Sequence, residues 1–410
     1  MRRAAKTRSR ASWAMALPAL AVSVAVALLV VPAIYAQKQK PDKKKQESVQ
    51  AQQAPKPQVD TSKLVWPSPP EVARIQWLTQ VSSQDDLTPP VPKKKKKVTW
   101  MDRLAGISIP GEAEKKTLAL AKPFGVAADS KGRIYAADTG NAQVFVFDVD
   151  KKLVQFLPGK FVMPIAVALD DADRVFVLDS KQHQVSALSA NWELEAVFGA
   201  DKLERPVAAA IDNENRFLYV VDAKASRLAV FDADRFTFLR FLGQPSDPLD
   251  PAEGTFATPL GVAVDNDGNV FVSDTLNDRV QMFDADGGFV QMFGKQGVAP
   301  GTFMRAKGIA VDTDGHVYVT DAEFSNVQVF DAEGRALAVF GTHGTEPGQF
   351  SLITGIFIDK QNHILVADQW HARVQVFRYF TEEEAEAARR AKGQSQAPGP
   401  RKEAKDSAPK

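Results

Sequence analysis

Short apolar runs separated by polar turns fill residues 123–378 of this chain. In the unit from Pro259 to Asp284 the apolar runs are rich in valine, phenylalanine and methionine, a composition typical of strands. Between the first two runs lies Asn266-Asp-Gly-Asn269, and Asp-Gly between strands predicts a hairpin turn. A second turn leads to a fourth run, Phe289 to Phe293. Each unit is therefore expected to form four antiparallel strands.

The unit recurs six times, and two aspartates mark each copy. The first follows the first strand and recurs as Asp129, Asp170, Asp212, Asp265, Asp312 and Asp359. The second follows the second strand and recurs as Asp138, Asp179, Asp222, Asp274, Asp321 and Asp368. The second series has gaps of 41, 43, 52, 47 and 47 residues. A period of this size indicates a supersecondary unit that buries its apolar face against copies of itself.

The sequence therefore predicts an all-β fold, a six-bladed β-propeller of four-stranded blades. The blades are expected to start near residues 123, 164, 206, 259, 307 and 354. The last unit lacks a fourth strand after Phe377. We expect residues 74–80 to supply it, with Arg74-Ile-Gln-Trp-Leu78 aligned on Phe289-Val-Gln-Met-Phe293, because closure by the other end of the chain removes a sheet edge.

The repeat resembles a known family. Gly261-Val-Ala-Val-Asp265, followed by Asp274-Thr-Leu-Asn-Asp-Arg279-Val-Gln-Met-Phe283, is similar to the NHL repeat, and blades 1, 4, 5 and 6 carry the pattern best. Blades 2 and 3 depart from it, because Gln182 and Ala225 stand where Asn277 does. The resemblance implies a six-bladed propeller of the bacterial type, exported or membrane-anchored.

The segments around the repeats have a different composition. Residues 1–36 join a basic start to an apolar run, which predicts export, as a cleaved signal peptide or as a retained transmembrane anchor. Residues 37–66 are rich in Gln, Lys and Pro and are expected to be a disordered linker. Residues 67–122 hold the closing strand, a Pro/Lys-rich loop and a lead-in, and residues 379–410 a charged helix and a disordered tail. The predicted location is membrane-anchored, periplasmic or extracellular.

The formal net charge of +1 conceals a strong separation of charge. Residues 123–378 carry 22 Lys and Arg against 35 Asp and Glu, whereas residues 1–122 carry 22 against 9. An acidic ring repels phosphate backbones, so an RNA-binding propeller is disfavoured and no nucleic-acid partner is expected. The chain has no cysteine, which excludes disulfides, thiol nucleophiles and thiolate metal sites.

The recurrent aspartates are expected to be structural, because each precedes a turn whose backbone N–H groups its carboxylate can accept. Asp265-Asn-Asp-Gly268 resembles the start of a calcium loop but lacks the later glutamate. We predict no catalytic residues, no metal site and no cofactor. A calcium-dependent lactonase- or hydrolase-like propeller remains the alternative, with calcium at the channel mouth, as does a lyase-like propeller, although the five histidines do not converge.

The remaining hypothesis is a binding surface. The loops after the second strands and those joining blades emerge on one face and differ between copies, and loops on a rigid scaffold often carry function. The candidate binding residues on this face are Asn141, Asn277, Arg305, Phe324, Trp370 and His371. The sequence thus favours a non-enzymatic scaffold for an unidentified protein or ligand at the cell envelope, held at the membrane by the N-terminal segment.

Overall fold

The computed structural model describes residues 60–68, 71, 73–89, 117–381, 383–385 and 387. All of them belong to one compact unit, Pro57–Lys410. The expected N-terminal export segment, the first part of the linker, the Lys-rich loop and the C-terminal tail lie outside the described residues. Among those that are described, no helix is long and apolar enough to cross a bilayer.

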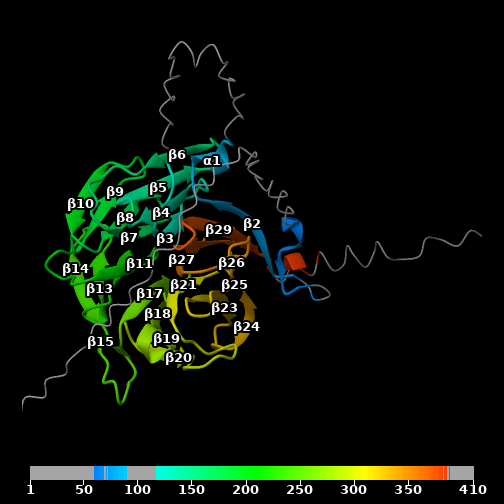
Figure 1. Ribbon diagram of the computed structural model, residues 1–410. Coiled ribbons are helices and arrows are strands. Elements are labelled where there is room, and N and C mark those ends of the chain that lie inside the picture. The colour runs from blue at the N-terminus through cyan, green and yellow to red at the C-terminus, as the bar shows by residue number, and fades with distance from the viewer. Residues whose placement is uncertain are drawn as a thin grey trace, which may run out of the picture. The chain divides into compact units, whose positions relative to one another are not determined.

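Six antiparallel sheets form the ring, five with four strands and one to which a short fifth strand is added, which confirms the all-β six-bladed fold (Figure 1). The strands of blades 1 to 3 are β3 Pro123–Ala128, β4 Ile134–Asp138, β5 Gln143–Asp148 and β6 Leu153–Phe156; β7 Pro164–Leu169, β8 Val175–Asp179, β9 Gln184–Leu188 and β10 Leu194–Phe198; β11 Pro206–Asp212, β12 Phe217–Asp222, β13 Arg227–Asp232 and β14 Phe238–Leu242. Blades 4 and 5 contain β17 Pro259–Val264, β18 Val270–Asp274, β19 Arg279–Phe283 and β20 Phe289–Phe293; β21 Ala306–Val311, β22 Val317–Asp321, β23 Asn326–Phe330 and β24 Ala336–Phe340.

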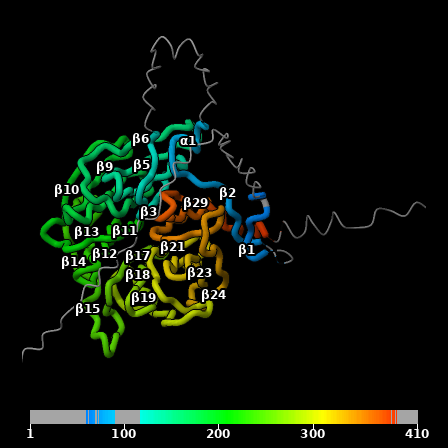
Figure 2. The backbone as a smooth tube through the Cα atoms, in the orientation of Figure 1, coloured from blue at the N-terminus to red at the C-terminus, as the bar shows by residue number. Residues whose placement is uncertain are grey.

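Blade 6 is built from both ends of the chain. Its strands are β27 Ile353–Ile358, β28 His363–Asp368, β29 Arg373–Tyr379 and β2 Ile75–Val81, and β2 pairs antiparallel with β29. The N-terminal part also contains one short strand, β1 Val65–Trp66, the 3₁₀ helix η1 Thr61–Lys63 and the helix α1 Gln84–Leu87 that follows β2. The tube trace shows the N-terminal strand lying beside the last strand of the ring (Figure 2).

The register of the closing strand differs from the expected alignment by three residues. Trp77 pairs with Phe377, and Val81 with Val374, so Trp77 rather than Arg74 stands where Phe289 does in blade 4. A shift by an odd number of residues exchanges the two faces of a strand. The expected alignment would have put Ile75 and Trp77 on the outward face, whereas both are buried.

The end of the segment that we expected to be a linker also differs. β1 adds a fifth strand outside β2. It carries the Trp66 ring to within 6.0 Å of Phe340 in blade 5 and 5.8 Å of Phe377 in blade 6, measured between ring centroids. The N-terminal chain therefore covers the junction between the last two blades.

Contacts between the first strands of neighbouring blades close the ring, including β27 with β3. The cores lie between blades. One buried cluster joins Ala263 and Val280 of blade 4 to Ile309 and Val317 of blade 5 through Phe303. Because the strands alternate in direction, the turns after first and third strands meet on one face, called here the turn face. The loops after second strands and those joining blades meet on the other, the loop face.

The blade-joining loops differ between the two halves of the ring. Blades 1 to 3 are joined by residues 157–163 and 199–205, whereas longer loops, 243–258, 294–305 and 341–352, lead into blades 4, 5 and 6. Two of the long loops form small parallel pairs, β15 Gln244–Pro245 with β16 Thr255–Phe256 and β25 Thr342–His343 with β26 Gln349–Phe350. The 3₁₀ helix η2, Thr275–Asn277, lies in the loop after β18.

Candidate functional site

The first aspartate of each blade braces its own turn. In blade 4, one Asp265 carboxylate oxygen accepts the backbone N–H groups of Asp267, at 3.0 Å, and Asn269, at 2.8 Å. The same pair of bonds, from the residues two and four positions on, recurs at Asp129, Asp170, Asp312 and Asp359. Asp212 accepts from Glu214 and Asn215 instead. The hydrogen bonds that these carboxylates accept from the backbone hold the turns in place.

The side chain four residues after the first aspartate completes the brace, and its chemistry changes around the ring. It is arginine in blades 1 to 3, asparagine in blade 4 and histidine in blades 5 and 6. Arg216 differs from the others because it reaches back to Asp170 of blade 2, at 2.9 Å. Burial would raise the pKa of Asp170, but hydrogen bonds from Arg216 and Arg174 outweigh it and lower that pKa. The charged side chains here tie blades 2 and 3 together.

His316 and His363 are thus turn braces rather than a joint site. His316 Nδ1 lies 3.0 Å from an Asp312 oxygen, and His363 Nδ1 lies 2.8 Å from an oxygen of Asp359. The hydrogen bond with Asp312 raises the pKa of His316, although burial of the ring opposes the shift.

The second aspartate of each blade joins two loops on the loop face. Asp321 accepts the backbone N–H of Met304 in the preceding blade-joining loop at 2.8 Å and that of Glu323 after the second strand at 2.9 Å. All six are buried, the members being Asp138, Asp179, Asp222, Asp274, Asp321 and Asp368. Burial would raise the pKa of Asp179, but hydrogen bonds from Gln182 and backbone amides lower it. In blades 4 and 6, Arg279 and Arg373 complete the brace as buried partners of Asp274 and Asp368.

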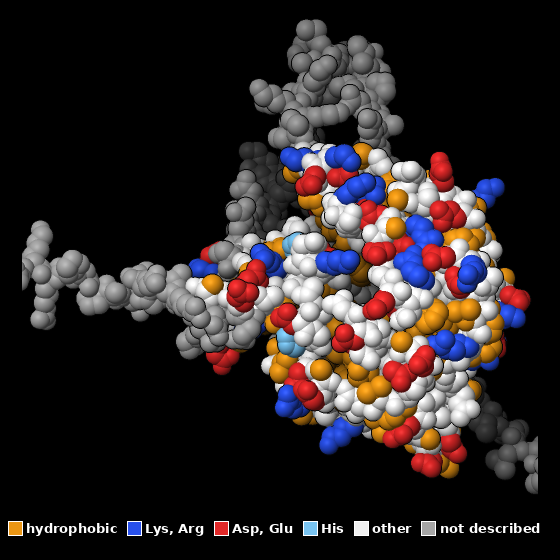
Figure 3. All heavy atoms as spheres, turned by 180° about the vertical axis from the view of Figure 1, so that it is seen from behind, with side chains coloured by type: hydrophobic (Ala, Val, Ile, Leu, Met, Phe, Trp, Pro, Cys, Tyr) orange, Lys and Arg blue, Asp and Glu red, His pale blue; other side chains and the backbone are white. Residues whose placement is uncertain are grey.

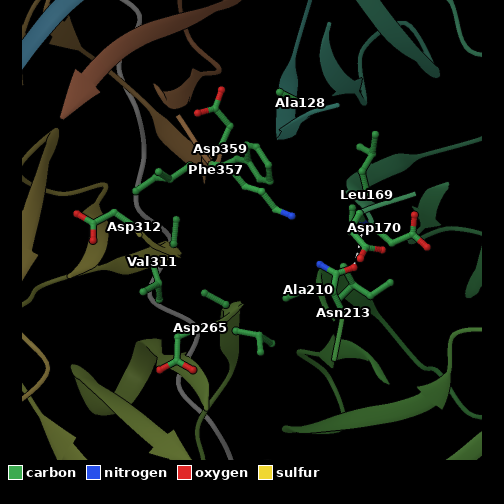
Figure 4. A pocket seen from close by; sticks show the side chains of 18 of the residues that line it. Ala128, Leu169, Asp170, Ala210, Asn213, Asp265, Val311, Asp312, Phe357 and Asp359 are labelled. Carbon is green, nitrogen blue, oxygen red and sulfur yellow. Dashed lines mark hydrogen bonds between the residues drawn. The ribbon is translucent and has the colours of Figure 1, made fainter. Parts of the chain in front are cut away.

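A cavity of about 330 Å³ forms the wide part of the central channel, on the turn face. Its wall is formed by apolar side chains of the six first strands, such as Val126, Leu169 and Phe357. The carboxylates of Asp265, Asp312 and Asp359 point away from its centre (Figure 4). The face turned away from the viewer in Figure 1 carries mixed charged side chains around a central hollow (Figure 3).

A polar collar surrounds this wide part of the channel. It consists of the residues that directly follow the first aspartates and so differ between blades: Ser130, Asp171, Asn213, Asn266, Thr313 and Lys360. Four of them take part in hydrogen bonds between blades. Ser130 Oγ donates to Asp173 at 2.7 Å, Asn213 accepts the N–H of Asp171 at 2.9 Å, and Thr313 Oγ1 donates to Asn362 at 3.1 Å. The sequence analysis placed its candidates on the opposite face and missed this collar. The sequence analysis chose candidates at positions that differ between the six repeats. The same criterion, applied to the position directly after each first aspartate, would have identified the collar.

At the loop face the channel narrows to a space of about 60 Å³. Neighbouring first strands approach so closely there that glycine is required. A Cβ at Gly261 would lie 2.3 Å from the Lys307 carbonyl oxygen, and one at Gly355 would lie 2.4 Å from that of Phe124. The glycine that opens the repeated Gly-Val-Ala-Val-Asp pattern is thus explained by packing of the ring at its narrow end.

Within the described part of the chain, no group of three or more His, Asp or Glu side chains is placed to hold a metal ion. Histidine, tyrosine and arginine are absent from the residues that line either part of the channel. The lining consists of an apolar wall, a polar collar, seven aspartates around the wide part, and one lysine near each end, Lys360 and Lys307. These groups suit binding.

The structure places the six candidate binding residues on the loop face, and most of them bond locally. Asn141 Nδ2 donates to the Ala119 carbonyl at 3.0 Å. The other bonded candidates pair with a nearby acid: Asn277 with Asp274 at 2.8 Å, Arg305 with Glu323 at 2.7 Å and His371 with Asp368 at 2.7 Å. Trp370 differs from these bonded candidates in being a large apolar side chain that is 74% exposed. The backbone N–H of Phe324 donates to Asp321.

Other exposed apolar side chains share the loop face with Trp370. They are Leu249, Leu276, Val298 and Met304, which lie in or beside the loops of blades 3 to 5, and Val162 between blades 1 and 2. The exposed apolar residues elsewhere, such as Leu194 and Val290, lie mainly on the outer strands. Large exposed apolar groups on loops are therefore concentrated in the half of the loop face formed by blades 4 to 6.

Three buried glutamines, also missed by the sequence analysis, hold the long loops of that half. Gln328 of β23 accepts the Gly301 N–H at 2.9 Å and donates to the Thr302 carbonyl at 2.8 Å. Gln281 and Gln375 make the equivalent bonds to the loops before blades 4 and 6. Their spacing of 47 residues was a readable signal.

The geometry defines a six-bladed propeller with an open central channel, and the comparisons identify its repeats. The NHL repeat family model matches residues 120–147, 256–283 and 303–330, which belong to blades 1, 4 and 5. These three segments are therefore NHL repeats, and they lie within a six-bladed ring.

Similar proteins are diverse in function. The protein named brain tumor from Drosophila melanogaster is 29% identical over 119 residues, which cover 27% of this chain and 11% of that protein. The chain thus matches about a tenth of this curated relative. A protein of unknown function from Bacteroides thetaiotaomicron superposes with a TM-score of 0.53 at 20% identity, covering 64% of this chain and 70% of the other. A Xanthomonas campestris gluconolactonase gives 0.50 at 14%, covering 64% and 87%. At these identities the structural likeness shows the fold alone.

Proposed function

We propose that the protein is a non-enzymatic binding propeller whose loop face, over blades 4 to 6, docks a protein partner at the cell envelope. The observation that carries the proposal is the set of exposed apolar side chains there, with Trp370 at 74%, Leu276 at 69% and Val298 at 83% exposure. Exposed apolar patches on loops mark interaction sites, and tryptophan is enriched among residues that dominate binding energy.

The scaffold beneath these side chains supports the proposal. Arg279, 6% exposed, donates to the carbonyls of Pro251, Ala252 and Thr255, so the loop before blade 4 is fixed from below. Arg373 does the same for residues 345–349 before blade 6. A loop that is ordered before binding loses less conformational entropy when a partner docks.

The test compares loop-face variants with a matched variant elsewhere. Trp370→Ser, Leu276→Ser and Val298→Ser should each reduce crosslinking to the native partner, and the triple variant should abolish it. Leu194→Ser changes a side chain of similar exposure, 64%, on the outer strand of blade 2 and should leave every crosslink intact. A triple variant with wild-type crosslinks, or equal losses in Leu194→Ser, would refute the proposed surface.

Location at the envelope is part of the proposal, and it rests on the basic and apolar composition of residues 1–36. Fractionation of cells and N-terminal sequencing of the mature protein test it. A new N-terminus near residue 37 indicates a cleaved signal, and a retained segment in the membrane fraction indicates an anchor. Recovery of the intact chain in the cytoplasm would contradict the proposal.

A lactonase or lyase activity is the competing function. Turnover in a screen of lactones and esters, together with stoichiometric calcium by elemental analysis, would replace the binding proposal. We expect neither.

A further inference from the structure

The two parts of the channel adjoin each other along the axis of the ring. The wide part at the turn face and the narrow part at the loop face are lined in common by one ring of apolar residues, Val126, Val167, Ala209, Val262, Ile309 and Ile356. From the polar collar to the narrow end the wall is therefore hydrophobic. Pockets of this kind, apolar with a few polar groups at defined places, are typical of small-molecule sites.

One charged side chain interrupts this wall at the narrow end. The second positions of the six first strands are Phe124, Ile165, Val207, Leu260, Lys307 and Thr354, so Lys307 is the sole ionisable group among the described residues that line the narrow part. It lies two residues before Ile309 on β21 and thus roughly 6–7 Å along the strand from the shared ring. The ammonium is within reach of a molecule held in the channel.

The backbone of Lys307 is fixed, whereas its ammonium has no acidic partner. The Lys307 carbonyl accepts a hydrogen bond from Ser273 of blade 4. Among the described residues no carboxylate forms an ion pair with its Nζ, and Glu323 pairs with Arg305 at 2.7 Å. Burial lowers the pKa of Lys307, and the positive charge of Arg305 lowers it further.

We propose that the channel binds an amphipathic small-molecule anion, a carboxylate or sulfonate with an apolar body, whose anionic group meets Lys307 while the body fills the wide part. An ammonium in apolar surroundings gains from a negative partner, and its three N–H donors suit such oxygens. The space of about 60 Å³ at the narrow end admits the anionic group, whereas about 330 Å³ at the turn face accommodates the body. The ligand therefore enters from the turn face. This site is separate from the protein-docking surface and does not depend on it.

Two fluorescent probes of similar shape and different charge test the site on the full chain. The anionic probe is 1-anilinonaphthalene-8-sulfonate and the neutral one is N-phenyl-1-naphthylamine. Wild type should bind one sulfonate probe per chain in the channel. Lys307→Met should weaken it about tenfold or more, as expected for loss of a charge-assisted hydrogen bond, and should leave the neutral probe within about twofold. Lys307→Arg should retain sulfonate binding.

Control variants separate the channel from other cationic sites. Lys224→Met removes an exposed lysine that pairs with Glu204 on the loop face and should bind both probes as wild type does. A urea unfolding midpoint equal to that of wild type shows that Lys307→Met is folded. Absent sulfonate binding, equal loss of both probes in Lys307→Met, or loss in Lys360→Met instead would overturn the proposal. These results leave the loop-face proposal unaffected, since Trp370→Ser tests that surface separately.

Discussion

Blades 1 to 3 and blades 4 to 6 form two halves of one ring built with different internal supports. The first half has short blade-joining loops, and the residue at the buried glutamine position is Phe145, Ser186 or Ala229. The second half has long loops, each held by a glutamine and filled by a phenylalanine without exposed surface, Phe256, Phe303 or Phe350. The exposed apolar loop residues follow the same division.

The difference teaches that a long loop on a propeller needs support from inside the blade. In the loop before blade 5, Gly294 ends the outer strand with a φ of 87°, and a Cβ there would lie 2.4 Å from the Phe303 ring. The glycine thus accepts both the left-handed backbone and the ring packed on it. Gly243 with Phe256 and Gly341 with Phe350 repeat the arrangement.

The largest effect is expected in blade 6 of the second half, which the N-terminal strand β2 completes. A chain beginning at residue 83 lacks β2 and loses burial of Ile75, Trp77 and Val81, together with the hydrogen bond from Trp77 to Gln375. Burial of three such side chains is worth roughly 5–8 kcal/mol, so this chain should unfold or aggregate at room temperature. A chain beginning at residue 57 keeps every described strand and should unfold with the wild-type urea midpoint. Equal midpoints for the two chains would show that β2 does not close the ring.

The next largest effect is expected from removal of one of the buried phenylalanines that fill the long loops, called here loop plugs. Phe303→Ala empties a site with no exposed surface between blades 4 and 5 and should lower the free energy of unfolding by about 3–5 kcal/mol. Leu276→Ala, at an exposed site on the same face, should change it by less than about 0.5 kcal/mol. Urea denaturation measures both. A small loss for Phe303→Ala would mean that the long loops do not depend on their plugs.

Loss of a loop-holding glutamine should distinguish the halves more locally. Gln328→Leu leaves the Gly301 N–H and the Thr302 carbonyl without their partner, which costs about 1–3 kcal/mol for each group left buried and unpaired. Limited proteolysis should then cut within residues 294–305. Ser186→Ala, at the equivalent position of blade 2, should leave the protease pattern unchanged. Protection of that loop in Gln328→Leu would contradict the assigned role.

The smallest effect concerns pH, and it arises in the second half because only blades 5 and 6 have a histidine beside the first aspartate. The pKa of His316 is raised in the folded state by its hydrogen bond with Asp312. Its stabilising contribution is therefore complete below the unfolded pKa, near 6.5, and is lost as the pH rises through the raised value. His316→Asn copies the neutral brace of Asn269 in blade 4. The variant should lose less stability than wild type between pH 6 and 8 in urea titrations.

The sequence predicted what the repeat encodes directly. The strands, the turns with their aspartates and the six-bladed ring follow from local patterns that every copy repeats. Closure by an N-terminal strand was also foreseeable, because blade 6 lacked a fourth strand. The register of this strand was not predicted correctly. Aligning Gln76 with Gln291 matches the two sequences, but it places Ile75 and Trp77 on the exposed face of the strand, whereas both are buried.

The sequence could not predict which side chains line the channel, because this depends on their positions along the channel axis. Whether Lys307 lines the channel depends on how closely six first strands approach one another, which the spacing of repeats does not determine. The same is true of the collar around the wide part, from Ser130 to Lys360. The regular spacing of the buried glutamines can be seen in the sequence. Their role cannot, because it depends on the path of the long loops to which they bond.

Closure of the ring through β2 also sets the order of events during synthesis. Trp77 and its partner Gln375 are separated by 298 residues, so the closing strand is synthesised long before the strand with which it pairs. Joining the ends of so long a segment costs about 5 kcal/mol of loop entropy in excess of a length-independent part. A nascent chain therefore holds an open, unfinished ring with an exposed strand edge until its last blade is released.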